Sequence, residues 1–130
     1  MVINRGATNT LYFTLTEKAT LTTPYYLFVF ENEITGQGKT FRMTDTSSYT
    51  WRYNKFSLVE TDGANDLTTG VVTLSPAGDW SYTIYEQSDA NNLTIANTTS
   101  IVETGKIKVV GDDLVTFTKY ATDRTYNVYE

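Results

Sequence analysis

Residues 70–87, GVVTLSPAGDWSYTIYEQ, constrain the fold of this chain more than any other segment. Apolar and polar residues alternate up to Leu74, turn-forming residues follow from Pro76, and the alternation resumes at Trp80. A period of two is the pattern of a β-strand with one buried face. The segment therefore predicts two strands joined in a hairpin, with these apolar residues together on one face of a sheet: Val72, Leu74, Trp80, Tyr82 and Ile84.

Strand patterns recur along the rest of the chain, and no window of a dozen residues has the apolar spacing of a helix. Residues 25–30, YYLFVF, are apolar throughout, which predicts a central strand covered on both faces or, as an alternative, one whose outer face meets a partner. Further strands are predicted at residues 10–16, 39–45, 55–60, 100–103, 106–110, 114–120 and 125–129. Short strands at this spacing are typical of a β-sandwich or a β-barrel, and we favour the sandwich. We expect a single domain over residues 1–130, an antiparallel β-sandwich, immunoglobulin-like or related, of about nine or ten strands.

The sequence contains neither cysteine nor histidine, and this narrows the chemistry available to it. Disulfides, thiolate catalysis and an imidazole base are excluded, and so are the usual nitrogen and sulfur ligands of transition metals. No Gly-x-Ser-x-Gly motif or phosphate-binding glycine loop is present either. The residues predict a protein that is not an enzyme and has no cofactor, with carboxylate or tyrosine chemistry as the remaining enzymatic alternative.

The charge of the chain also bears on its partners. The formal net charge is −5, and the ten Lys and Arg residues are scattered. Nucleic-acid binding requires a clustered basic surface, so we expect no nucleic-acid partner. No apolar run is long enough for a transmembrane helix, and residues 1–10 lack the features of a signal peptide. We therefore expect no membrane partner and synthesis in the cytoplasm.

Four stretches of the sequence are distinctive: NTLYFTLTEKATLTTPYYLFVFENE near the start, RYNKF, TGVVTLSPAGDWSYTIYEQ and IVETGKIKV. Together they resemble small virion proteins of tailed phages and prophages of Bacteroidota. The resemblance covers about residues 11–110 and includes no active-site motif. It implies a β-sandwich that decorates the capsid or belongs to the neck, tail or baseplate, held there by contacts with other virion proteins. It also implies a homo-oligomeric or particle-bound state and localisation to the virion.

Candidate interface residues are the bulky side chains that the core of one sheet does not require: Tyr25, Trp51, Arg52 and Tyr53. Aromatic and Arg side chains supply most of the binding energy in many protein interfaces. Two alternative binding functions involve these residues or other loops: carbohydrate binding and Ca²⁺ binding. The exposed aromatic rings could stack on sugars, as in a carbohydrate-binding module. Asp62, Asn65 and Asp66 could offer oxygens to Ca²⁺, although turns favour the same residue types.

Overall fold

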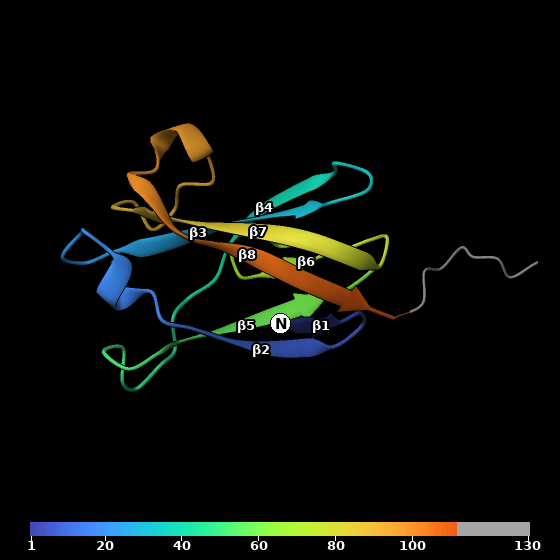
Figure 1. The fold of residues 1–130 in the computed structure, drawn as a ribbon, viewed down its shortest axis with the longest axis horizontal. Coiled ribbons are helices and arrows are strands. Elements are labelled where there is room, and N and C mark those ends of the chain that lie inside the picture. Colours follow the sequence, from blue (N-terminus) through green and yellow to red (C-terminus); the bar gives the residue numbers. More distant parts are fainter. Residues whose placement is uncertain (112–130) are drawn as a thin grey trace, which may run out of the picture.

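The computed structural model describes residues 1–111, which form two β-sheets and two short 3₁₀ helices. The five-stranded sheet has the order β1-β8-β7-β3-β4, and the three-stranded sheet has the order β2-β5-β6. Figure 1 shows the two sheets as separate layers, with β2 and β5 below β3, β4 and β7. The strands are β1 (Val2–Asn4), β2 (Thr8–Phe13), β3 (Tyr25–Asn32), β4 (Gly38–Arg42), β5 (Asn54–Glu60), β6 (Val71–Val72), β7 (Gly78–Gln87) and β8 (Ser100–Val110); the 3₁₀ helices are η1 (Thr16–Lys18) and η2 (Ile95–Asn97). The predicted all-β fold is confirmed.

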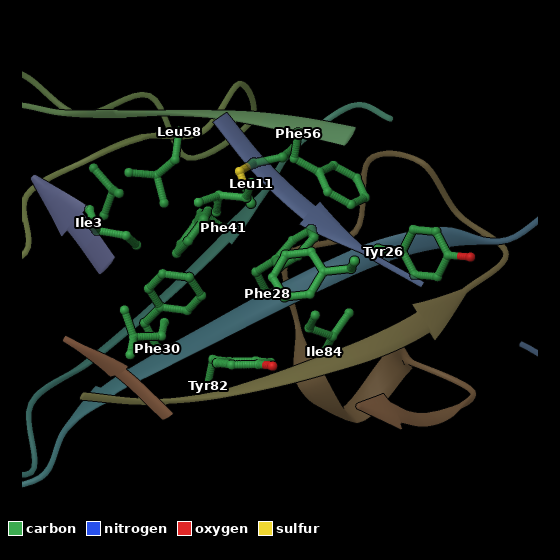
Figure 2. Packing of buried hydrophobic residues seen from close by; sticks show 14 of the residues in the cluster. Ile3, Leu11, Tyr26, Phe28, Phe30, Phe41, Phe56, Leu58, Tyr82 and Ile84 are labelled. Atoms are coloured by element: carbon green, nitrogen blue, oxygen red, sulfur yellow. The ribbon is translucent and has the colours of Figure 1, made fainter. Parts of the chain in front are cut away.

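One core lies between the two sheets and is rich in aromatic rings (Figure 2). The centroid of the Phe28 ring, from β3, lies 4.9 Å from that of Phe56, from β5, so the sheets are in direct contact. Phe30 and Phe41, from neighbouring strands of the larger sheet, are also 4.9 Å apart. Edge-to-face pairs of this kind add to the stabilisation from burial alone. Among the described residues, no helix is long and apolar enough to cross a membrane.

The prediction of wholly antiparallel sheets is wrong at two strand pairs. β1 runs parallel to β8, with Ile3 opposite Val109, and β6 runs parallel to β5, with Val59 opposite Val71. Two parallel strands need a connection that brings the chain back to the end of the sheet where the first strand began. For β1 and β8, all of the residues between the two strands form this connection. For β5 and β6 the ten residues 61–70 are sufficient because only two residues of β6 are paired.

The predicted hairpin in residues 70–87 is also wrong. β6 belongs to the three-stranded sheet and β7 to the five-stranded sheet, so residues 73–77 cross from one layer to the other. The five apolar residues of the predicted face are nevertheless all buried. They converge on one core from two opposing sheets, and a period of two indicates which side chains point inward, whichever sheet they belong to.

The remaining strand predictions differ from the structure mainly in their ends. Residues 25–30 do form a central strand, β3, between β7 and β4. The strand predicted at residues 10–16 is observed as Thr8–Phe13. The two strands predicted on either side of Gly105 are one strand, β8, because Gly105 leaves room for the Tyr82 ring: a Cβ there would lie 2.6 Å from Tyr82 Oη. The strands predicted at residues 114–120 and 125–129 lie outside the described residues.

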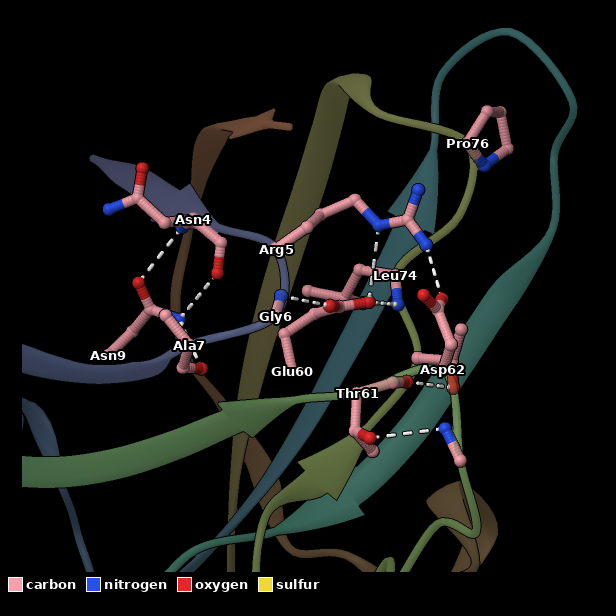
Figure 3. A network of polar contacts seen from close by, with 12 residues as sticks. Asn4, Arg5, Gly6, Ala7, Asn9, Glu60, Thr61, Asp62, Leu74 and Pro76 are labelled. Atoms are coloured by element: carbon pink, nitrogen blue, oxygen red, sulfur yellow. Dashed lines mark hydrogen bonds and ion pairs between the residues drawn. The ribbon is translucent and has the colours of Figure 1, made fainter. Parts of the chain in front are cut away.

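Two buried carboxylates fix loops to the ends of strands. Glu60, at the end of β5, accepts hydrogen bonds from the backbone N–H of Gly6 (2.7 Å) and of Leu74 (2.9 Å) and pairs with Arg5 (3.4 Å), as Figure 3 shows. The Arg5 side chain is itself buried and also pairs with Asp62. Glu60 therefore joins three separate segments: the β1–β2 turn, the end of β5 and the crossover after β6.

Glu86, near the end of β7, is the second buried carboxylate and is fully covered. It accepts hydrogen bonds from the backbone N–H of Thr20 and of Leu21 (both 2.9 Å) and from the hydroxyls of Thr20 and Ser100. Burial opposes ionisation, but the bonds from Ser100, Leu21 and Thr20 outweigh it and lower the pKa of Glu86. The charged form of Glu86 is thus part of the folded structure.

The free energy of unfolding is expected to fall in acid partly because Glu86 must be protonated. Its pKa in the folded state lies below its ordinary value of 4.5, so the unfolded state binds the proton more readily. Its contribution is complete above about pH 4.5 and is lost as the pH falls through the folded-state pKa. Urea unfolding at pH 7 and pH 3 should show a larger loss for the wild type than for Glu86→Gln, which cannot titrate. Equal losses in the two proteins would contradict this.

Candidate interaction surface

The segment between β4 and β5, residues 43–53, is an ordered loop whose two ends are fixed by side chains. Asp45 accepts hydrogen bonds from the backbone N–H of Ser47 (2.9 Å) and Lys55 (3.1 Å) and from the Asn54 amide (2.6 Å). Asn54 is buried and accepts a further bond from the backbone N–H of Leu15 (2.6 Å). The base of the loop is therefore tied to β5 and to the segment after β2.

The tip of this loop presents aromatic rings to solvent. Tyr49 accepts hydrogen bonds at its carbonyl from the N–H groups of Arg52 (2.9 Å) and Tyr53 (3.1 Å), which closes a tight turn. Trp51, within this turn, is 88% exposed, and Tyr49 is 63% exposed. A folded chain has no packing reason to expose a ring of this size, and large exposed apolar groups mark interaction sites when they cluster. Tyr49 is a residue that the sequence analysis missed, although it sits among the same small polar residues as Trp51.

Tyr25 lies at the start of β3 and is 43% exposed. It borders a hollow of about 220 Å³, and Trp51 borders a second hollow of about 260 Å³. The two hollows share three lining residues, Pro24, Tyr26 and Asp45, so they adjoin. We call Tyr25, Tyr49 and Trp51 the loop-end surface.

The Tyr26 hydroxyl between the two hollows remains protonated at any physiological pH. Burial raises the pKa of Tyr26 to about 12, and the charge of Asp45 adds to this, while a hydrogen bond with Thr16 acts in the opposite direction. Arg42, which lines the first hollow, donates to the carbonyl of Ala90. This end of the molecule therefore combines apolar rings with a few fixed polar groups.

The other two predicted interface residues, Arg52 and Tyr53, do not line the two hollows beside Tyr25 and Trp51. Tyr53 is half-buried, and its ring makes an edge-to-face contact with Tyr12 at 5.8 Å between centroids. Tyr53 and Tyr12 line a third hollow, on the side of the molecule where β2 approaches β8. Arg52 is exposed and lines none of these three hollows. The structure thus brings Tyr25 and Trp51 to adjoining hollows and places Tyr53 elsewhere.

The three residues weighed as Ca²⁺ ligands all have hydrogen-bond or ion-pair partners within the protein. Asp62 pairs with Arg5, Asn65 accepts a hydrogen bond from Thr73 (2.9 Å), and Asp66 accepts from the hydroxyl of Thr68 (2.6 Å). Hydrogen bonds from Thr68 lower the pKa of Asp66. In the part of the chain that the structure describes, no three acidic side chains gather as a metal site would require.

Comparison with known proteins identified no relative of this chain. No protein-family model matches the chain, and no curated protein or solved structure is significantly similar to it. The likeness to phage virion proteins accordingly stays a prediction from the sequence, and the function is argued from the surface itself.

Proposed function

We propose that this protein is a non-enzymatic structural component of a tailed-phage virion, made in the cytoplasm of the bacterial host and assembled onto the particle. In this role it is a capsid auxiliary or decoration protein that binds neighbouring virion subunits through the loop-end surface. The observation that carries the proposal is the 88% exposure of Trp51 on a loop whose base is fixed by Asp45 and Asn54. The resemblance of the sequence to small virion proteins supplies the class of partner.

The construction of the loop supports a role in binding. A protein that binds with an ordered loop loses little conformational entropy on association, because the loop already has its bound shape. Trp and Tyr are the residues most enriched among those that dominate interface energy. The hollows beside Tyr25 and Trp51 offer a partner places to insert its own side chains.

The proposal includes the finer features of the fold and of the virion position. We infer an immunoglobulin-like or related sandwich of about nine or ten strands. The major capsid protein is the preferred partner, and an adaptor position in the neck, tail or baseplate is the alternative placement. A carbohydrate-binding module is a second candidate function, favoured by the exposure of both Trp51 and Tyr49, since sugar rings stack on such side chains.

Trp51→Ala is expected to weaken binding to purified capsids by about tenfold or more, the effect of removing an energetically dominant interface residue. Binding would be measured by co-sedimentation of the purified protein with capsids that lack it. The matched control is Ile34→Ala, since Ile34 is 86% exposed and precedes β4, away from the loop-end surface. The control should bind like the wild type.

Two results would contradict the proposal. One is undiminished binding of Trp51→Ala to capsids and to isolated neck, tail and baseplate proteins. The other is binding of the wild type to glycans of the host surface, lost in Trp51→Ala, with no binding to virion proteins, which would support the carbohydrate-binding alternative. Unfolding in urea should be the same for Trp51→Ala and the wild type, which separates a loss of binding from a loss of fold.

A further inference from the structure

The hollow beside Tyr25 contains a charged side chain. The hollow has a volume of about 220 Å³ and is lined by residues from the start of β3, the end of β4 and the loop after β7. Pro24, Tyr25 and Met43 contribute apolar surface to it. Among the described residues that line it, Arg42 is the only one with a cationic side chain. We call this space the Arg42 hollow.

The Arg42 guanidinium is held in place from the loop after β7. Its Nη1 donates to the carbonyl of Ala90. That loop is itself fixed to the end of β7, because the buried Gln87 side chain donates to the carbonyl of Asn92 (3.0 Å) and accepts from the Asn92 amide (2.7 Å). Arg42 is therefore ordered before a ligand arrives, which lowers the entropic cost of binding.

The Nε–H of this guanidinium lacks a partner within residues 1–111. Arg42 Nε is buried and has no hydrogen-bond acceptor there, and no carboxylate of that range forms an ion pair with the side chain. Buried polar groups in folded proteins are nearly always hydrogen-bonded. Because Nη1 is engaged by Ala90, Nε and the second Nη remain, and these two groups form the edge of a guanidinium that binds a carboxylate through two parallel hydrogen bonds.

The described acidic groups near Arg42 are engaged elsewhere. Asp45 lines the same hollow, but its carboxylate accepts the hydrogen bonds that fix the base of the 43–53 loop. The pKa of Asp66 is lowered first by hydrogen bonds from Thr68 and last by the charge of Arg42, and no ion pair joins Asp66 to Arg42. The Arg42 hollow thus lacks a counterion from the part of the chain that the structure describes.

The last described strand ends far from this hollow. Arg42 is opposite Leu27, Leu27 is opposite Tyr85, and Tyr85 is opposite Ile101, so these four residues lie in one row across the five-stranded sheet. β8 ends at Val110, nine residues or about 30 Å farther along the sheet. The loop-end surface, in contrast, borders the hollow directly, so a partner bound there is the nearest source of a carboxylate.

The size and the walls of the Arg42 hollow favour a single acidic side chain as its occupant. Its volume of about 220 Å³ is below the range of about 300–1,000 Å³ that is typical of small-molecule sites. Pro24 and Met43 offer apolar surface to the methylene groups of such a side chain. The negative charge of Asp45 in the same hollow disfavours a doubly charged group, such as phosphate, more than a singly charged carboxylate.

We propose that the Arg42 hollow binds a Glu or Asp side chain of the protein that contacts the loop-end surface, with its carboxylate paired to the Arg42 guanidinium. Tyr25 belongs to the loop-end surface and also lines the hollow, so one partner covers the exposed rings and fills the hollow together. The identity of this partner as a virion protein rests on the proposed function, whereas the carboxylate chemistry of the hollow does not.

The carboxylate chemistry is tested by NMR on the purified protein alone. The chain has four Arg residues, so it gives few Arg Nε–Hε signals, and Arg42→Lys identifies the signal of Arg42. Propionate reproduces a Glu side chain and should shift this signal in a saturable way at millimolar concentration, whereas propionamide, its neutral counterpart, should not. Sodium chloride at the same ionic strength measures screening. Equal responses to propionate and propionamide, or a larger response to inorganic phosphate, would overturn the proposal.

Binding of the partner is tested by co-sedimentation with capsids. Arg42→Gln should weaken binding by about tenfold or more, because the partner's carboxylate loses its cation. Arg42→Lys should weaken it less, because the charge is kept while the paired hydrogen bonds are lost. The matched control is Lys108→Gln, which removes the same charge from an exposed residue of β8 and should bind like the wild type. Urea unfolding of each variant shows whether the fold is retained.

These measurements separate the inference from the proposed function. Capsid binding that Trp51→Ala loses and Arg42→Gln keeps would overturn the inference and leave the proposed function intact. A wild-type protein that binds no virion protein would contradict the proposed function, and the propionate titration would then decide the carboxylate site by itself.

The source of the carboxylate is identified with Arg42→Lys and a carbodiimide, which joins an amine to a carboxylate in contact with it through an amide bond. We expect the introduced lysine to be joined to a Glu or Asp of the capsid protein, located by mass spectrometry. The same treatment without capsids is the control. A cross-link to Asp123 or Glu130 of the same chain, in place of one to the partner, would show that the chain fills its own hollow and would overturn the proposal.

Discussion

Replacing Trp80 with alanine is expected to lower the free energy of unfolding by about 3–5 kcal/mol, the usual cost of removing a buried aromatic side chain from a core. Trp80 is fully buried at the start of β7, next to the crossover between the two sheets. Its indole N–H donates to the carbonyl of Pro76 at 2.9 Å, so the side chain also fixes the crossover. The substitution therefore removes core packing and one of the two hydrogen bonds that the Pro76 carbonyl accepts, the other coming from the Asn32 amide at 3.3 Å.

Urea unfolding followed by circular dichroism would measure this loss. Fluorescence is unsuitable, because the chain has only two Trp residues and Trp51, the one that would remain, is exposed in the folded state too. The matched control is Trp51→Ala, which should change the free energy of unfolding by no more than about 0.5 kcal/mol. Equal destabilisation by the two substitutions would show that Trp51 supports the fold and would remove it from the loop-end surface.

The alternation of apolar residues made the core predictable from the sequence but left the partners of each strand open. Val72 and Trp80 were expected to face inward, and both do. Their placement on one hairpin was wrong, because inward-pointing residues of two opposing sheets and of one sheet give the same period. Strand β1, only three residues long, offers too little pattern to be recognised, and its parallel pairing depends on residues more than a hundred positions away.

The positions of the buried carboxylates have a signal in the sequence. Glu60 follows Phe56 and Leu58 at intervals of two, and Glu86 follows Ile84 in the same way. An alternating strand that ends on an acidic residue at an inward position indicates a carboxylate turned toward the end of the core. The hydrogen-bond partners of such a carboxylate lie in loops that are distant in the sequence, such as Thr20 for Glu86. No local sequence pattern predicts these partners.

The aromatic residues of the candidate interaction surface were predictable from the sequence, but the directions of their side chains were not. The aromatic residues of the 43–53 loop stood out because small polar residues surround them. Their directions depend on the contacts of Asp45 and Asn54 at the base of the loop, which separate Trp51 at the tip from Tyr53 beside Tyr12. Residues that are close in the sequence therefore line different hollows, Trp51 one of the two adjoining hollows and Tyr53 the third.

Removing the Glu60 carboxylate is expected to have an effect as large as that of removing the Trp80 ring. Glu60→Ala leaves the N–H groups of Gly6 and Leu74 without an acceptor and takes the buried Arg5 guanidinium away from its buried partner. Breaking a buried ion pair by removing one member costs about 3–5 kcal/mol, mostly because the other charge stays buried. Asp62 remains beside Arg5 and offsets part of this cost.

The role of burial can be isolated with Asp62→Ala, which removes the other carboxylate from the same Arg5. The Asp62 side chain is about half exposed, so its ion pair is screened by water and should contribute no more than about 1 kcal/mol. Urea unfolding at low and at high salt would measure both variants, and salt should reduce the effect of Asp62→Ala while leaving that of Glu60→Ala nearly unchanged. If the two substitutions cost the same, the backbone N–H groups that Glu60 binds have another acceptor, and the carboxylate is not what holds the three segments together.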